Sequence, residues 1–191
     1  MTALEKRRYT EEEYLELERV SDFKHEFYGG EIFAMAGGTR THALICHNVD
    51  VRLGMQILQR LCQIYGSDMR LRVEATGLQT YPDLSGLCDE PRFSSQTEDT
   101  LLNPSFIIEV LSKSTQDYDK TEKFRQYRKI KSLRDYVLIS QYSVYVEHFT
   151  RQPDGYWRLE SYEALEDTFT LESINCTLEL GQIYWKVALE G

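Results

Sequence analysis

The chain has 191 residues, of which 41% are hydrophobic and 28% charged, and its formal net charge is −9. The length suits one globular domain over residues 1–191, and no apolar run is long enough to form a membrane-spanning helix. The acidic balance argues against a simple nucleic-acid binder, because phosphate backbones are bound by clustered lysines and arginines. Contact with nucleic acid would need a local basic face or a bound metal.

The amino terminus and the cysteines favour a cytoplasmic protein. Residues 1–10 are charged and lack the apolar stretch of a signal peptide. Cys46, Cys62, Cys88 and Cys176 are scattered, with no CxxC pair and no zinc-like spacing. We therefore expect four reduced thiols.

The first half of the chain predicts helices and a hairpin before the first sheet strands. Thr10 and Glu13 form a capping box that opens a helix, and Gly29-Gly30 suits the turn of a hairpin. Apolar residues then recur at helical spacing, and afterwards apolar and charged residues alternate as in a half-buried strand. The expected elements are a helix over 11–20, strands over 24–28 and 31–36, a helix over 41–64, and strands over 69–73 and 78–84.

In the second half, a turn-rich segment over residues 88–104 precedes a short apolar run that reads as a strand buried on both faces. A basic amphipathic helix and further strands follow, two of them separated by the turn Pro153-Asp154-Gly155. Together with the first half, this order predicts an α/β or α+β fold with a mixed central β-sheet flanked by helices. The expected elements are strands over 105–111, 136–140, 144–150 and 157–162, a helix over 120–129, and a strand or short closing helix over 177–187.

Two carboxylates and a lysine interrupt this pattern. Asp83 follows Pro82 in an apolar setting, and Glu109 lies inside an apolar strand, where a carboxylate is costly unless it is paired or bound to a metal. Two carboxylates from neighbouring strands could hold Mg²⁺ or Mn²⁺, which prefer oxygen ligands. Lys123, on the following helix, could orient a water or stabilise the charge that develops on a phosphate. Each residue alone could instead be a turn aspartate, a paired glutamate or a surface lysine.

These segments resemble the PD-(D/E)xK nuclease superfamily and, more closely, the Uma2 family of restriction-endonuclease-like proteins, also known as domain of unknown function 820. The resemblance covers nearly the whole chain, and its most specific part is a Glu-Val-Leu-Ser strand followed by an Asp-x-x-x-Lys helix. It implies a restriction-endonuclease-like core. The segments that carry it are His25–Ile32, His42, Tyr81–Leu84, Ile108–Thr115, Asp119–Tyr127 and Arg134–Leu138.

The resemblance implies that Asp83 and Glu109 are metal ligands. Leu111 occupies the place of the lysine in a Glu-x-Lys motif, so the lysine is displaced to Lys123, with Lys113 as the alternative. Asp119 precedes Lys123 by four residues and would pair with it on one helix face, either aiming the lysine or forming a weak surface bridge.

Three further residues have both a functional and an ordinary interpretation. Glu26 matches an amino-terminal carboxylate of the family and would be an additional metal ligand, or a solvated strand residue. His42 could contact phosphate or assist proton transfer, or could be a partly buried residue near the start of a helix. Ser112 suits turn formation or a phosphate contact.

A basic cluster follows Asp117 and, with Arg70 and Arg72, is the candidate face for nucleic acid. A solvated helix face is the alternative. The cluster consists of Lys120, Lys123, Arg125, Arg128, Lys129, Lys131 and Arg134.

We therefore expect a Mg²⁺- or Mn²⁺-dependent endonuclease that hydrolyses DNA by attack of a metal-activated water. Because cutting both strands of a duplex favours two sites, we also expect a homodimer. A catalytically inactive nuclease-fold protein that binds nucleic acid or regulates is the main alternative, and a carboxylate-pair glycosidase is a third.

Overall fold

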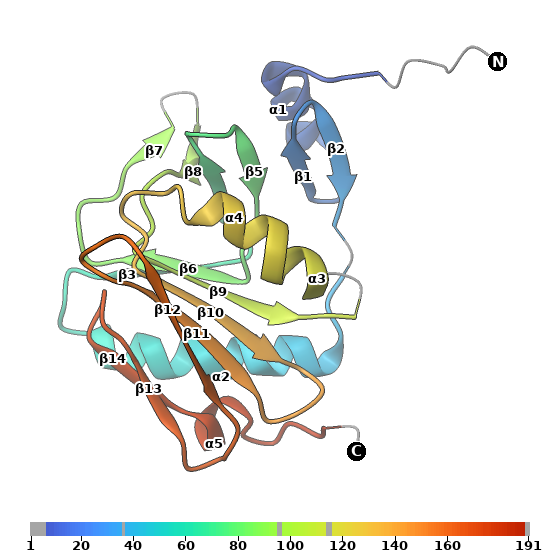
Figure 1. Cartoon of the computed structure of the whole chain (residues 1–191). Coiled ribbons are helices and arrows are strands. Elements are labelled where there is room, and N and C mark those ends of the chain that lie inside the picture. The colour runs from blue at the N-terminus through green and yellow to red at the C-terminus, as the bar shows by residue number, and fades with distance from the viewer. Residues whose placement is uncertain (1–6, 36, 95–96, 114–115, 190–191) are drawn as a thin grey trace.

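The computed structural model describes residues 7–35, 37–94, 97–113 and 116–189. Its centre is a six-stranded sheet in the order β12-β11-β10-β9-β6-β3 (Figure 1). The middle strands β9 and β10 are parallel and the other pairs antiparallel, which confirms the predicted mixed sheet. The strands are β3 (Gln63–Gly66), β6 (Leu84–Leu87), β9 (Phe106–Leu111), β10 (Asp135–Ser140), β11 (Val146–Arg151) and β12 (Trp157–Tyr162).

Different layers cover the two faces of this sheet, as Figure 1 shows. The long helix α2 (Arg40–Ile57) packs on one face together with the hairpin β13 (Thr168–Leu171) and β14 (Cys176–Glu179) and the short helix α5 (Leu180–Ile183). A continuous helical segment packs on the opposite face, and we call it the α3–α4 segment. It consists of α3 (Gln116–Tyr118), the π-helical turn η1 (Asp119–Lys123) and α4 (Phe124–Tyr127).

The alternation of side chains along the buried strand β9 determines which face of the central sheet holds its carboxylate. Phe106, Ile108 and Val110 point to the α2 side, whereas Ile107 and Leu111 point to the α3–α4 side. Side chains alternate along a strand, so Glu109 shares the α3–α4 side. The one carboxylate of the strand is therefore placed beneath the helix that carries Lys123.

A second sheet, in the order β2-β1-β5-β4-β8-β7, lies on that same side of the molecule. Helix α1 (Glu11–Val20) begins with the predicted capping box, and β1 and β2 form the predicted hairpin. The part of the expected hairpin at Ala36 lies outside the described residues. The strands are β1 (His25–Tyr28), β2 (Glu31–Ala34), β4 (Arg70–Val73), β5 (Leu78–Thr80), β7 (Phe93–Ser94) and β8 (Thr97–Leu101).

Three element boundaries differ from the prediction, each because of tertiary pairing. The long helix ends at Ile57, since residues 63–66 pair as strand β3 with β6. The strand expected over 78–84 is divided near Pro82 into β5 and β6, which belong to different sheets. Proline has no N–H to donate to a ladder, so it suits this crossing. The turn-rich segment over 88–104 contains the short hairpin β7–β8.

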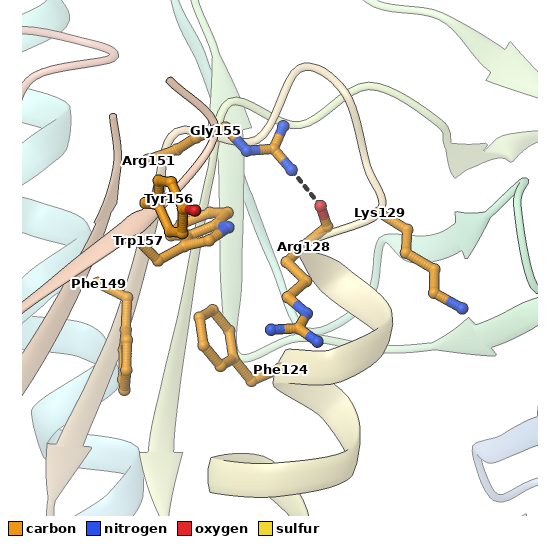
Figure 2. A pocket seen from close by; sticks show the side chains of 8 residues that line it. All are labelled: Phe124, Arg128, Lys129, Phe149, Arg151, Gly155, Tyr156 and Trp157. Atoms are coloured by element: carbon orange, nitrogen blue, oxygen red, sulfur yellow. Dashed lines mark hydrogen bonds between the residues drawn. The ribbon is translucent and has the colours of Figure 1, made fainter. Parts of the chain in front are cut away.

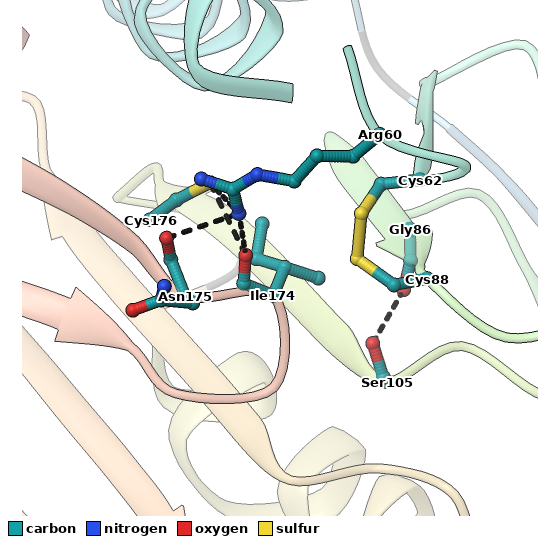
Figure 3. Close-up of a disulfide and its surroundings, with 8 residues drawn as sticks. All are labelled: Arg60, Cys62, Gly86, Cys88, Ser105, Ile174, Asn175 and Cys176. Carbon is teal, nitrogen blue, oxygen red and sulfur yellow. Dashed lines mark hydrogen bonds between the residues drawn. A yellow bond between two sulfur atoms is a disulfide. The ribbon is translucent and has the colours of Figure 1, made fainter. Parts of the chain in front are cut away.

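The expectation of four reduced thiols is wrong, because Cys62 and Cys88 form a disulfide (Figure 3). Gln63 pairs with Leu87, so the antiparallel register of β3 and β6 brings the two cysteines side by side. Sequence spacing alone does not reveal that pairing. Cys46 and Cys176 are free. Of the helices in the described part of the chain, none is long and apolar enough to cross a membrane.

Candidate active site

The side chain of Lys123 lies among three carboxylates. Its Nζ is 3.1 Å from Glu26 Oε1, 3.2 Å from Glu109 Oε1 and 3.2 Å from Asp119 Oδ1. All four side chains are at most 11% exposed. We call these four residues the carboxylate–lysine cluster. Because it is buried, Glu26 is no solvated strand residue and Asp119–Lys123 is no surface bridge.

Three separate layers of the fold supply the cluster. Glu26 comes from β1 in the second sheet, Glu109 from the centre of β9, and Asp119 and Lys123 from η1. The last two are four residues apart, which puts both on one side of the helix. The cluster therefore depends on the packing of the second sheet and the α3–α4 segment against the central sheet.

Hydroxyl groups donate hydrogen bonds to two of these carboxylates and to the backbone of the third residue. The Tyr127 hydroxyl donates to Glu109 Oε1 at 2.9 Å, and the Thr80 hydroxyl donates to Glu26 Oε1. Tyr136 donates to the backbone carbonyl of Asp119 at 3.0 Å, which fixes the π-helical turn over the sheet. These donors hold the acidic groups in place, as a preorganised site requires.

Burial dominates the electrostatics of the cluster. Desolvation raises the pKa of Glu109 to about 8, although Lys123 opposes the shift, and the charges of Asp119 and Asp83 add to it. Burial alone would lower the pKa of Lys123, but Glu109, Glu26 and Asp119 together raise it well above its ordinary value. The lysine therefore stays charged, and burial makes the ionisation of Glu109 beside it costly.

Asp83 lies beside this cluster at the end of the neighbouring strand. Leu84 pairs with Ile108, so Asp83 comes opposite Glu109, and its Oδ2 accepts a hydrogen bond from the Val110 N–H at 2.7 Å. Its Oδ1 is 3.1 Å from His42 Nε2, and this hydrogen bond raises the pKa of His42 above 6.5. The structure thus shows His42 oriented by Asp83 at the start of α2.

Cys46 adds a thiol to the His42–Asp83 pair. Its Sγ is 3.6 Å from His42 Nδ1, and one ligand atom from each of the three residues lies within 4.8 Å of the others. Burial raises the pKa of the Cys46 thiol, and the charges of Asp83 and Glu109 raise it further. Among the described residues, this is the group of three whose atoms are spaced closely enough to share one metal ion.

The two candidate lysines lie in different environments. Lys123 contacts Glu109 directly, whereas Lys113 is exposed and its ammonium lies 5.3 Å above the ring of Tyr142. Ser112 is half-buried, and its carbonyl accepts a hydrogen bond from the backbone of Gln116 at 2.9 Å. Geometry therefore favours Lys123 as the lysine of the site.

The residues expected to contact nucleic acid are not together on one surface. Arg70 is 3% exposed and forms an ion pair with Asp99 at 2.8 Å. It is therefore buried in the second sheet and is not available to bind nucleic acid at the surface. Arg72 is paired with Glu11 at 2.7 Å, and Lys120 with Glu147 at 3.0 Å. Arg128, by contrast, is exposed at the end of α4.

Sequence reasoning missed several supporting groups. Tyr127 is four residues after Lys123 and Cys46 is four residues after His42, so helical spacing placed each beside a candidate residue. That spacing was the available signal. Thr80 and Tyr136 gave none, because their roles depend on strand pairing and on how the layers pack.

Comparison with known sequences identifies relatives along most of the chain. The profile of the Uma2 family, described as "Putative restriction endonuclease", matches residues 11–181. Uncharacterized protein slr1290 of Synechocystis sp. is 37% identical over 177 residues, which cover 91% of this chain and 90% of the relative. Uncharacterized protein sll1609 of the same organism is 38% identical over 150 residues, covering 78% and 85%.

A solved structure has the same fold. The crystal structure of a "putative nuclease belonging to DUF820" from Anabaena variabilis matches with a TM-score of 0.74 at 17% identity, covering 91% of this chain and 96% of that one. The predicted α+β architecture and the resemblance drawn from sequence motifs are both confirmed. The chain belongs to the Uma2 family.

Proposed function

We propose that this chain is a divalent-metal-dependent nuclease that hydrolyses DNA, with a site of the PD-(D/E)xK type. One observation carries the proposal, namely that three buried carboxylates share a single lysine. Burial, together with the neighbouring charges of Asp119 and Asp83, raises the pKa of Glu109, and a bound cation would lower it again. Buried carboxylates are costly to ionise, and a divalent cation bound among them would stabilise their charged form.

The oxygen donors support such a cation by their chemistry, although among the described residues the group with closely spaced ligand atoms is that of His42, Cys46 and Asp83. Glu109 and Asp83 would hold the metal, with Glu26 as a further oxygen donor, and Mg²⁺ and Mn²⁺ prefer oxygen ligands. A bound divalent ion supplies an activated water and polarises the scissile phosphate. Lys123 stays charged and stabilises negative charge that develops on the phosphate, while Tyr127 keeps Glu109 oriented.

The group of His42, Cys46 and Asp83 fits a hard cation less well. Its nitrogen, sulfur and oxygen donors suit Zn²⁺ more than Mg²⁺. The raised pKa of His42 favours its charged form, which repels a cation, and the Cys46 thiol would first have to lose its proton. We therefore assign His42 to orienting Asp83 and assisting proton transfer.

The relatives support the same activity. The family is described as "Putative restriction endonuclease", and the structural neighbour from Anabaena variabilis as a "putative nuclease". The contact between Lys123 and Glu109 also makes a glycosidase carboxylate pair the weaker hypothesis, because a lysine occupies the space beside the acid.

The test is cleavage of plasmid, duplex and single-stranded DNA in Mg²⁺, Mn²⁺ or Zn²⁺. Glu109→Gln and Asp83→Asn should each reduce the cleavage rate at least about a hundredfold, since even residues that only orient metal ligands cost 10- to 100-fold. The matched control is Glu122→Gln, which changes a half-exposed carboxylate of the same helical segment. If cleavage occurs only with Zn²⁺ and is lost in Cys46→Ser, the metal is instead held by His42, Cys46 and Asp83.

The alternative is a nuclease scaffold without catalysis. Calorimetric titration with Mn²⁺ separates the two hypotheses. If the chain is an enzyme, the wild type should bind Mn²⁺ and the Glu109→Gln variant should not. Absence of both metal binding and cleavage would leave the scaffold interpretation. We further propose a homodimer, which a molar-mass measurement by light scattering tests, because cutting both strands of a duplex favours two sites.

A further inference from the structure

A second feature lies on the other side of the α3–α4 segment. A pocket of about 510 Å³ opens between the end of α4 and the hairpin formed by β11 and β12 (Figure 2). Lys123 points into the carboxylate–lysine cluster, whereas the next residue, Phe124, lines this pocket. We call it the aromatic–cationic pocket.

The floor of the pocket is aromatic and closely packed. The Phe124 ring lies 4.4 Å from that of Phe149 and 5.3 Å from that of Trp157, measured between centroids. Phe124 also stacks on Tyr136 at 5.4 Å, which anchors the floor in the core. These ring contacts hold the floor in place as an apolar surface.

Arg151 joins the two walls of the pocket. Its guanidinium donates to the carbonyl oxygens of Arg128, Ile130 and Lys131 after the end of α4, as Figure 2 shows for Arg128. It also lies 5.0 Å from the centre of the Trp157 ring. Burial lowers its pKa, and the nearby charge of Arg134 lowers it further.

Tyr156 stands at the rim as an exposed aromatic residue. It is 76% exposed, yet its backbone is held in a tight turn: its N–H donates to Asp154 Oδ1 at 3.1 Å, and Gly155 has a φ of +89°. A large exposed aromatic ring on a fixed turn leaves one face available. Stacking on such rings is how proteins bind unpaired bases without regard to sequence.

The charge of the pocket is opposite to that of the whole chain. Its lining contains Arg128, Lys129 and Arg151 but no carboxylate, although the chain has a net charge of −9. Arg128 and Lys129 are exposed. An anionic ligand with flat rings is complementary to this surface, and a strand of nucleic acid offers both phosphates and bases.

We propose that the aromatic–cationic pocket binds an unpaired nucleotide of a nucleic-acid strand. The base stacks on Tyr156 and the aromatic floor, while Arg128 and Lys129 contact the flanking phosphates. This inference rests on the proposed nuclease function and narrows its substrate class to nucleic acid with a single-stranded stretch. The carboxylate–lysine cluster and the pocket lie beside successive residues, Lys123 and Phe124, of the same helical segment.

Binding measured in EDTA tests the proposal without cleavage. Fluorescence anisotropy would compare a labelled single-stranded oligonucleotide with a blunt duplex of the same sequence. The single strand should bind more tightly. Tyr156→Ala should weaken that binding by about tenfold or more, and Tyr156→Phe should keep it, because stacking needs the ring and not the hydroxyl. Arg128→Ala should reduce the slope of log affinity against log salt by about 0.7.

Matched variants on another surface are the controls. Phe23, which is 72% exposed, and Arg19, which is exposed, both lie in or beside α1, and their alanine variants should bind like the wild type. The proposal would be overturned if Tyr156→Ala bound the oligonucleotide as tightly as the wild type. It would also be overturned if polyglutamate competed as well as unlabelled single-stranded DNA, which would point to an acidic protein partner. Loss of cleavage with binding retained would contradict only the nuclease function.

Discussion

The two sides of the α3–α4 segment use the same kinds of residues in opposite ways. On the inner side one lysine is buried among three carboxylates, and on the outer side arginine and lysine side chains surround aromatic rings without any carboxylate. In the sequence, Lys123, Arg128 and Lys129 belong to one basic cluster. The comparison teaches that the residues of one basic cluster can have different environments. Neighbouring positions of a helix point to different faces, so some of these cations are buried and others are exposed.

The difference also concerns energy. A buried charge contributes strongly when its partners are present and costs strongly when they are removed, whereas an exposed charge is screened by water. Substitutions on the inner side should therefore change stability, and substitutions on the outer side should change binding. The following predictions test that division, from the largest expected effect to the smallest.

Lys123→Met should have the largest effect on stability. It leaves Glu26, Glu109 and Asp119 buried without their cation, which should cost about 3–5 kcal/mol of unfolding free energy. Urea denaturation in EDTA measures the loss. Added Mn²⁺ should restore part of it, because the metal replaces the missing positive charge. A stability equal to that of the wild type would contradict the buried cluster.

The stability of the metal-free protein should fall as the pH rises from about 4.5 to 8. The pKa of Glu109 is raised from 4.5 to about 8 in the folded chain, so the folded state binds the extra proton in this range. The contribution is complete below pH 4.5 and lost as the pH passes 8. Melting temperatures in EDTA should show this slope, and Glu109→Gln, which cannot titrate, should flatten it.

Tyr127→Phe should have a moderate effect. It removes the hydroxyl that donates to Glu109 Oε1 at 2.9 Å in a fully buried position, which should cost about 1–2 kcal/mol. Chemical denaturation measures the change. The control is Tyr156→Phe, which removes an exposed hydroxyl in the aromatic–cationic pocket. If both variants lose equal stability, the contrast between the two sides fails.

Arg125→Ala should have the smallest effect. Arg125 lies two residues after Lys123, but its ion pair with Glu122 at 2.8 Å is solvent-exposed. Exposed pairs contribute little because water and salt screen them. We expect the melting temperature to stay within experimental error of the wild type. A loss comparable with that of Lys123→Met would show that burial does not decide the outcome.

The sequence was most informative where local chemistry conflicted with its surroundings. Glu109 interrupts an apolar strand, and Lys123 follows Asp119 by one helical turn, so both were predictable as partners in a buried site. The capping box at Thr10 and the Gly29-Gly30 hairpin were predictable because they are local.

Features that depend on distant pairing were not predictable. Arg70 looked like one charge of a basic surface, but the pairing of β4 with β8 buries it beside Thr100 and Asp99. The cysteine pair and the division at Pro82 likewise depend on which strands become neighbours. Alternation and spacing describe each strand by itself and do not identify its neighbour.

The Cys62–Cys88 bond bears on how the edge of the central sheet avoids pairing with the sheet of another molecule. β3 is an outer strand of the central sheet and pairs with β6 along only four residues. Outer strands present unpaired backbone groups that can join the sheet of another molecule. The disulfide holds one end of this short strand against β6. Its reduction would therefore weaken the pairing of the edge strand β3 and favour association between chains.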